Sequence, residues 1–215
     1  WTHQRPEIEA SSAAMMRNGK GFPLFPPDAK SFQVGYDWAL STKNKGVTIT
    51  ASKSPLPIRT TFEQARQGLK DGAVILQEVK GGQTVVFAVL GDLPLIPVVE
   101  AAASLETKGI GVRIVSVINP RRLYRPQDTG WNTCSEADGG FLDDAGFEQL
   151  FGGDALIAVT GGASLMLEPI MLRSQVKRDT FAWRRGETAS SAGQVMAFNG
   201  LTAETLTKRA IELVD

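Results

Sequence analysis

Apolar and polar residues alternate along this chain in short blocks, each with the length of one helix or one strand. Runs of apolar and β-branched residues predict strands, and apolar residues three or four positions apart predict helices. The strands predicted from these runs are 22–25, 47–51, 73–79, 84–90, 111–117, 155–160 and 180–184. The predicted helices are 7–17, 29–43, 62–69, 94–105, 143–151, 162–172 and 202–214. This alternation predicts an α/β fold with mostly parallel sheets, flanking helices and right-handed crossovers.

Polar residues at the block edges predict where helices begin. Asp28 is expected to be the N-cap of the helix that follows it, and Thr60 or Thr61 the N-cap of the next helix, because their side chains accept bonds from free N–H groups. The run 73–79, which begins with four apolar residues, is predicted to be a strand buried on both faces. Residues 124–140 have no periodicity and predict a long surface loop.

The polar segment Lys80-Gly81-Gly82-Gln83 is the predicted domain boundary, because a second series of strands and helices starts after it. Residues 1–80 then form an incomplete α/β unit, and residues 81–215 form a complete one.

Composition excludes several classes of protein. Lys and Arg total 23 and Asp and Glu total 23, so the basic excess of a general nucleic-acid binder is absent. No apolar run approaches the roughly 20 residues that span a membrane. The single cysteine, Cys134, cannot form an internal disulfide and fits a reducing compartment. These features predict a soluble, cytoplasmic protein with no nucleic-acid or membrane partner. One His and one Cys do not make a zinc site.

Two positions are candidates for chemistry. His3 is the only histidine, and imidazole exchanges protons near neutral pH; the alternative is a terminal residue without a role. Lys53 and Ser52 follow the predicted strand 47–51, where ligands bind in parallel α/β sheets. A lysine there suits a phosphate or carboxylate; the alternative is a solvated loop lysine.

Three further features are weaker candidates. Gly161-Gly162 follows a predicted strand and opens a predicted helix, which indicates either an anion site or a simple tight turn. Gly91-Asp92 follows strand 84–90 and is a weaker candidate nucleotide site. The basic clusters Arg121-Arg122 with Arg125, and Arg184-Arg185, are interpreted as solvated surface.

Several motifs, in order, resemble the transketolase group of thiamine-diphosphate enzymes. The stretch from Thr2-His3-Gln4 to Pro27-Asp28-Ala29 resembles the end of their pyrimidine-binding domain. The stretch Thr50–Pro55 resembles the loop that holds the sugar phosphate, where transketolases have Ser-Arg-Gln and phosphoketolases Gly-Lys-Gln-Pro. Lys53 favours the phosphoketolase version. The second-domain matches are Leu90-Gly91-Asp92-Leu93-Pro94 to Ala-Gly-Asp-Val-Pro, Val112–Ile118 to the second strand, and Phe147–Phe151 to Phe-Asp-x-Leu-Phe.

The resemblance implies the C-terminal part of a phosphoketolase-like enzyme: residues 1–80 would end a pyrimidine-binding domain, and residues 81–215 would be a transketolase-like C-terminal domain. The complete enzyme would cleave xylulose 5-phosphate or fructose 6-phosphate with inorganic phosphate, giving acetyl phosphate and an aldose phosphate. Thiamine diphosphate and Mg²⁺ would serve that reaction. His3 would be catalytic, and Lys53, Ser52 and Gln4 would bind substrate.

The resemblance also implies partners. The family's diphosphate-binding domain lies upstream, so this chain alone is expected to bind no cofactor and to be inactive. The chain starts with Trp1 rather than Met, and we expect a missing N-terminal portion or a partner subunit. Family members are dimers, so a homodimer is also expected.

Two alternatives to a phosphoketolase remain open. The family motif His-Gly-Tyr-Pro-Trp is replaced by Gly161-Gly162-Ala163-Ser164-Leu165, which favours a non-catalytic α/β interaction or regulatory module. A part of a transketolase-type ketol transferase is the second alternative, and it predicts arginine at position 53.

Overall fold

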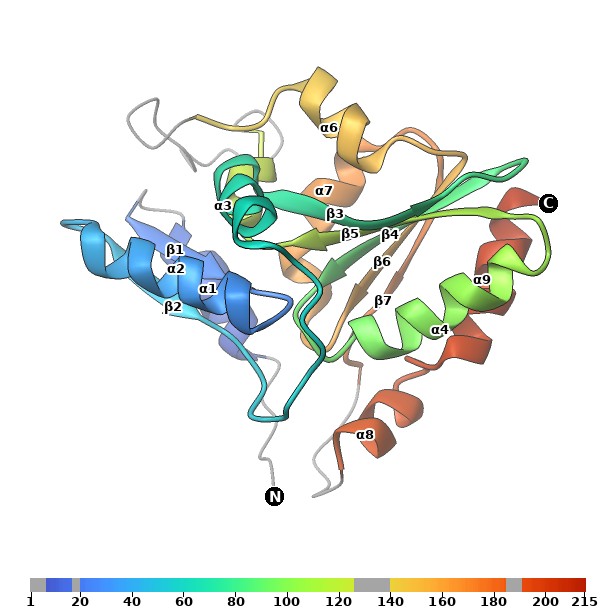
Figure 1. The fold of residues 1–215 in the computed structure, drawn as a ribbon, viewed down its shortest axis with the longest axis horizontal. Helices are drawn as coiled ribbons and strands as arrows, with labels where there is room; N and C mark the ends of the chain where they lie inside the picture. The colour runs from blue at the N-terminus through green and yellow to red at the C-terminus, as the bar shows by residue number, and fades with distance from the viewer. Residues whose placement is uncertain (1–6, 17–19, 126–139, 185–190) are drawn as a thin grey trace.

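The computed structural model describes residues 7–16, 20–125, 140–184 and 191–215, which form two sheets with helices around them (Figure 1). The strands are β1 (Gly21–Leu24), β2 (Gly46–Ile49), β3 (Ala73–Val79), β4 (Thr84–Leu90), β5 (Gly111–Val117), β6 (Ala155–Thr160) and β7 (Lys177–Phe181). The helices are α1 (Glu7–Met16), α2 (Ala29–Ser41), α3 (Phe62–Asp71), α4 (Leu95–Glu106), α6 (Asp144–Phe151), α7 (Glu168–Arg173), α8 (Ala192–Phe198) and α9 (Ala203–Val214). Two 3₁₀ turns are η1 (Pro120–Leu123) and η3 (Ser164–Met166).

The five-stranded sheet has the order β3-β5-β4-β6-β7, and β1 pairs with β2 in a separate parallel sheet. Every pair in the larger sheet is parallel except β3 with β5. The predicted α/β fold with mostly parallel sheets and flanking helices is therefore confirmed.

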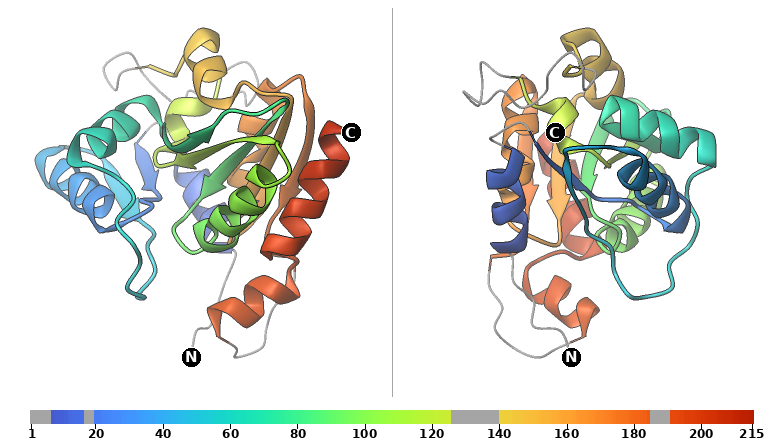
Figure 2. Two further views of the ribbon diagram at one scale, coloured as in Figure 1. Left: turned by 45° about the vertical axis from the view of Figure 1, so that its right-hand side comes forward. Right: turned by 90° about the vertical axis from the view of Figure 1, so that its left-hand side faces the viewer.

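The central strands of the larger sheet are buried on both faces. Consecutive residues of β4 point to opposite faces, so Val85, Phe87 and Val89 join one core cluster and Val86, Ala88 and Leu90 join the other. Helices α4 and α9 cover the first face, and α6 and α7 cover the second (Figures 1 and 2). Burial on two faces explains why the sequences of β4 and β6 are unbroken apolar runs.

The strand 73–79 differs from its prediction. It was expected to be buried on both faces, but β3 is an antiparallel edge strand, and only Ala73 and Val74 are buried. Its second half carries Gln77 and Glu78 at the open edge, and Glu78 pairs with Arg113 at 2.5 Å. Polar side chains at an edge remain in contact with solvent. The boundary after residue 80 stays a prediction, although the pairing groups β3 with the strands that follow it.

The smaller sheet is attached through its first strand. The N–H of Phe25 donates to the carbonyl of Ile118 at 2.8 Å, and Met16 and Phe25 lie in the core of the larger sheet. Helix α1 packs beside η3, next to α7 (Figure 2). The two sheets are thus held together by shared core residues.

Arg121 and Arg122 correct the interpretation of a solvated basic cluster, because both are buried. The Arg121 guanidinium lies 4.0 Å from the centre of the Phe22 ring, where a cation is attracted by the ring face. Nε of Arg122 donates to the carbonyl of Lys70 at 2.6 Å, at the C-terminus of α3. There the guanidinium compensates carbonyls that have no partner within the helix.

The C-terminal elements differ from the sequence prediction in three places. A single helix over 162–172 was predicted, but the chain forms η3 and then α7, which has Pro169 in its first turn. The last strand is Lys177–Phe181 rather than 180–184, and α8 was not predicted. Most of the predicted loop 124–140 lies outside the described residues.

The carboxylate of Asp28 joins three segments of the smaller unit. It accepts hydrogen bonds from the N–H of Ser31 at 2.8 Å, and from those of Arg59 and Thr60 at 2.7 Å each. The Thr60 hydroxyl donates to it as well. Asp28 is therefore the N-cap of α2, as predicted, while Thr61 is the N-cap of α3.

These contacts also set the acidity of Asp28. Burial of the carboxyl by itself would raise its pKa, but the hydrogen bonds from Ser31, Arg59 and Thr60 outweigh burial and hold the pKa below its ordinary value of 3.8. The folded state thus favours the ionised form. This contribution to stability is complete above the unfolded pKa and is lost as the pH falls through the folded pKa.

Replacing Asp28 by Ala is expected to lower the free energy of unfolding by about 3 kcal/mol, because a helix cap is lost and buried N–H groups lose their acceptor. Asp28→Asn should be milder and should remove part of the loss of stability below about pH 4. Urea unfolding between pH 2 and 7 measures both effects. Asp37→Asn, an exposed carboxylate on the same helix, is the control, and an equal effect there would contradict the assignment to Asp28.

Candidate functional site

The carboxyl ends of β2 and β4 meet, although these strands belong to different sheets. After β2 the N–H of Thr50 still pairs with the carbonyl of Leu24 at 2.9 Å, and the chain then leaves the sheet. Two residues on, the N–H of Ser52 donates to Oδ2 of Asp92 at 2.7 Å. Asp92 comes directly after β4 and Gly91. In Figure 1 the segment between β2 and α3 runs past this end of the larger sheet.

Lys53 stands at this junction without a partner among the described residues. Its side chain is exposed, and it forms no hydrogen bond or ion pair with any of them. Next to it, the Ser52 hydroxyl oxygen is buried and makes no hydrogen bond within the described part of the chain. Buried polar groups in proteins are nearly always hydrogen-bonded. An unpaired ammonium suits a phosphate or carboxylate, and the residue before it in the chain has an unpaired hydroxyl that could donate as well.

The end of β6 lies next to this junction, and the turn that follows it is held by bonds within the chain. A side chain added at Gly161 would lie 3.5 Å from Pro94, which places the turn after β6 beside the start of α4. The N–H of Gly162 bonds back to the Thr160 hydroxyl at 3.2 Å, and its carbonyl accepts from Trp183 at 2.8 Å. The turn is followed only by the three-residue η3, so the simple tight turn is the interpretation that the structure supports.

The structure therefore describes only some of the predicted site residues. Ser52 and Lys53 lie at the ends of β2 and β4, as expected for a ligand site in a parallel α/β sheet. His3 and Gln4 lie outside the described residues. Asp92, as the partner of Ser52, was not predicted. Its position after strand 84–90 was the one available signal, and it did not reveal a bond to a residue 40 positions away.

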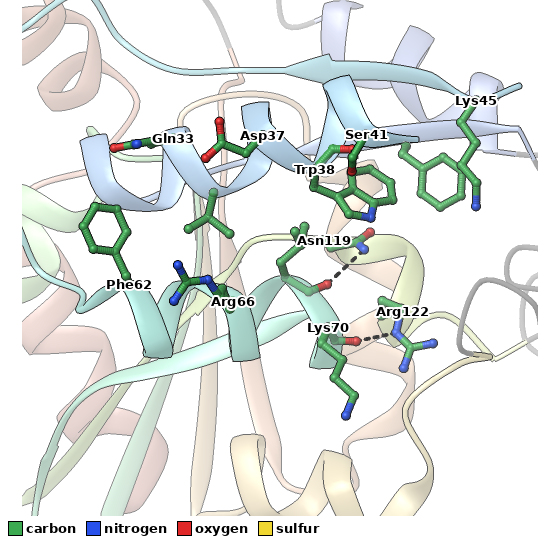
Figure 3. A pocket seen from close by; sticks show the side chains of 13 residues that line it. Gln33, Asp37, Trp38, Ser41, Lys45, Phe62, Arg66, Lys70, Asn119 and Arg122 are labelled. Atoms are coloured by element: carbon green, nitrogen blue, oxygen red, sulfur yellow. Dashed lines mark hydrogen bonds between the residues drawn. The ribbon is translucent and has the colours of Figure 1, made fainter. Parts of the chain in front are cut away.

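A separate cavity of about 880 Å³ lies between α2 and α3 (Figure 3). Trp38 and Phe22 form an edge-to-face pair at 5.2 Å in its wall, and Lys45 lies over the Phe22 ring. The cavity is lined by Phe22, Gln33, Val34, Asp37, Trp38, Ser41, Lys45, Phe62, Arg66, Leu69, Lys70, Asn119 and Arg122. Ser52, Lys53 and Asp92 are not in this lining, so this cavity and the predicted site are different places.

At the inner end of the cavity, η1 closes the C-terminus of α3. The side-chain amide of Asn119 donates to the carbonyl of Leu69 at 3.2 Å, next to the bond from Arg122 to Lys70 (Figure 3). These two side chains hold the C-terminus of α3 in place. No sequence pattern pointed to the cavity, because its walls come from four separate segments.

The described residues set two limits on the chemistry. Within residues 7–16, 20–125, 140–184 and 191–215, His, Cys, Asp and Glu form no group of three or more that could hold a metal ion. No helix in the described part of the chain has both the length and the apolar character needed to cross a membrane.

Comparison with known proteins shows the fold. No protein-family model matches the sequence, and no curated protein does. Transketolase from Campylobacter jejuni matches with a TM-score of 0.64 and 17% identity, over 98% of this chain and 28% of its own. Transketolase from Leishmania mexicana matches with a TM-score of 0.68 and 19% identity, over 99% of this chain and 27% of its own. The fold is transketolase-like.

A third solved structure is of a divided enzyme. A split-gene transketolase, described as an inactive β4 tetramer, matches with a TM-score of 0.63 and 15% identity, over 90% of this chain and 57% of its own. Our chain thus spans little more than a quarter of the length of the first two transketolases. The transketolase resemblance seen in the sequence is confirmed for the fold, and the phosphoketolase assignment stays a prediction.

Proposed function

We propose that this chain is the C-terminal part of a thiamine-diphosphate-dependent enzyme that cleaves ketose phosphates. The observation that carries the proposal is the unpaired Lys53, beside the unpaired Ser52 hydroxyl, where β2 ends in a transketolase-like fold. In this proposal the Lys53 ammonium binds the phosphate of the sugar as a compact point charge. The Ser52 hydroxyl donates a second bond to the same phosphate.

The reaction we propose is that of a phosphoketolase. Xylulose 5-phosphate or fructose 6-phosphate reacts with inorganic phosphate, and the products are acetyl phosphate, a shorter aldose phosphate and water. Lysine at position 53 supports this choice, since the family resemblance gives arginine to transketolases. The solved structures with this fold are transketolases, which supports ketol transfer to an aldose phosphate as the alternative reaction.

The remaining roles follow from this assignment. His3 is proposed as a catalytic polar contact to the substrate, and Gln4 as a neighbouring substrate ligand. Thiamine diphosphate with Mg²⁺ supplies the electron sink for carbon–carbon cleavage when it is bound. The described residues do not fit the metal, because they contain no cluster of suitable ligands. On the family resemblance, which has the metal ligands upstream, we propose that a polypeptide outside this chain supplies them.

The edge of β2 supports a missing partner. Gly46 and Thr50 donate to β1, and residues of a strand alternate in direction, so the N–H and C=O groups of Val47 and Ile49 face away from β1. They have no hydrogen-bond partner in the described part of the chain. The outer edge of β1 is closed instead, since Pro23 has no N–H and the Gly21 carbonyl accepts from Arg121.

An open edge with unpaired backbone groups is a template for another strand. We propose that a strand of the missing N-terminal portion, or of a partner subunit, pairs with β2 and completes the smaller sheet. Assembly of the complete enzyme as a homodimer and its location in the cytoplasm are further parts of the proposal.

A non-catalytic α/β interaction or regulatory module is the second candidate function. It is supported by the turn at Gly161–Leu165, which stands in place of the His-Gly-Tyr-Pro-Trp motif and whose Gly162 N–H and carbonyl bond within the chain itself. It predicts association with a partner but no ketose-phosphate chemistry.

The edge of β2 is tested by Val47→Pro, which removes an outward-facing N–H while the bonds to β1 remain. We expect it to reduce association with the missing portion about tenfold or more in native mass spectrometry, because a ladder bond is lost. The melting temperature of the isolated chain should change little. Thr48→Pro, which removes a donor that faces β1, is the control and should destabilise the chain itself. Unchanged association of Val47→Pro would show that β2 is not the contact.

The role of Lys53 is tested in the complete protein. Lys53→Ala is expected to raise KM for xylulose 5-phosphate by about tenfold or more, because a bond to a charged group is lost. Lys53→Arg should retain most of the affinity. Lys43→Ala, at the opposite end of β2, is the matched control for loss of an exposed lysine. Equal KM values for Lys53→Ala and the unchanged protein would contradict the proposed phosphate contact.

The reaction itself is tested with a hydroxamate assay for acetyl phosphate. We expect acetyl phosphate from xylulose 5-phosphate only when inorganic phosphate is present. Ketol transfer to an aldose phosphate without inorganic phosphate would identify the transketolase-type alternative. A complete assembly that binds no thiamine diphosphate in native mass spectrometry and shows neither reaction would identify the non-catalytic module.

A further inference from the structure

Asp92 joins the larger sheet to the loop that carries Lys53. Its Oδ2 accepts the Ser52 N–H at 2.7 Å, and its Oδ1 accepts the N–H of Leu93 at 2.7 Å. We propose that Asp92 is a positioning residue for phosphate recognition: it fixes the backbone at Ser52 and so sets the place of the Lys53 ammonium. The inference rests on the proposed phosphate contact of Lys53.

The loop depends on this one contact. The N–H of Thr50 still pairs with β1, and the N–H of Arg59 bonds to Asp28. For the residues between them, 51–58, the bond from Ser52 to Asp92 is the one hydrogen bond to any part of the chain that the structure describes. Without it, eight successive residues would have no hydrogen bond to hold them, and loops of that kind are mobile.

Asp92 itself lies between two well-packed elements, β4 and α4. It directly follows the buried strand β4, and Gly91 before it has a φ of 93°, which favours glycine. Leu93, whose N–H holds the second carboxylate oxygen, leads into α4, and Leu95 of that helix is buried. A carboxylate that accepts two backbone N–H groups is held in one orientation, and such charge-assisted bonds are stronger than neutral ones.

The geometry also leaves Lys53 free. Both oxygens of Asp92 are occupied by backbone N–H groups, and no ion pair joins Asp92 to Lys53. Asp92 therefore orients the loop without neutralising the ammonium. This separation predicts that loss of Asp92 acts on the phosphorylated end of the substrate, while the reacting carbons are unaffected.

The test compares Asp92→Ala with Asp154→Ala in the complete protein. Asp154 makes the same kind of bond at the other end of β4, where its Oδ2 accepts the N–H of Thr84 at 2.7 Å. Asp92→Ala is expected to raise KM for xylulose 5-phosphate by about tenfold, with kcat within about twofold, because the phosphate ligand loses its position. KM for the unphosphorylated ketose xylulose should not change.

The matched variants separate positioning from general destabilisation. Asp154→Ala should leave the KM values for both sugars unchanged. Asp92→Asn keeps an oxygen acceptor and should recover part of the affinity. Hydrogen exchange on the 215-residue chain should show faster exchange of the Ser52 N–H in Asp92→Ala than in Asp154→Ala, which tests the tether without any activity measurement.

The outcomes distinguish the two proposals. If Lys53→Ala raises KM and Asp92→Ala does not, the positioning role is overturned and the phosphate contact stands. An equal rise in KM for xylulose and its phosphate, or an equal effect of Asp154→Ala, would also overturn the positioning role. If Lys53→Ala has no effect, the phosphate contact is wrong and the inference fails with it. Less than additive effects of Lys53→Ala and Asp92→Ala in the double variant would support it.

Discussion

Two carboxylates determine how the segment between β2 and α3 is held. Asp28, at the end of β1, accepts the N–H groups of Arg59 and Thr60 and fixes the far end of the segment. Asp92, at the end of β4, accepts the N–H of Ser52 and fixes the near end. An ionised carboxylate has lone pairs for several donors and forms strong bonds to backbone N–H groups. A segment without helix or strand is in this way given a defined course past the ends of both sheets.

The sequence pattern predicted the elements whose environment is simple. Strands β4 and β6 begin and end at the predicted residues, because strands buried on both faces have unbroken apolar sequences. The N-cap at Asp28 was also predicted, since capping is a local interaction. The burial of Arg121 was not, because it depends on the ring of Phe22, about a hundred residues away. The same is true of Asp92: its position was visible in the sequence, but its contact with Ser52 depends on the packing of two sheets.

The comparison with transketolases supports the fold of this chain more strongly than it supports a function. At 17–19% identity, the match to transketolases extends over nearly the whole chain, so it establishes the backbone arrangement. Function depends on particular side chains. Lys53 agrees with the phosphoketolase motif rather than with the transketolase motif, whereas Gly161–Leu165 differ from the motif His-Gly-Tyr-Pro-Trp. The unpaired Lys53 and Ser52 hydroxyl support the proposed phosphate contact, whereas the turn at Gly161 does not have the side chains of that motif. Lys53 and the turn at Gly161 therefore give separate information about the proposed chemistry.

The closed outer edge of β1 has a geometric consequence for assembly. With Pro23 and Arg121 on one side, the smaller sheet can lengthen only beyond β2. Two identical copies that join β2 to β2 about a twofold axis must place those strands antiparallel. A twofold axis along the strands would keep them parallel, but it would bring identical residues level with each other, and a parallel ladder needs them staggered. A different segment is under no such restriction and can continue the parallel direction of β1 and β2. A parallel third strand would therefore show that another polypeptide segment, and not a second copy, completes the smaller sheet.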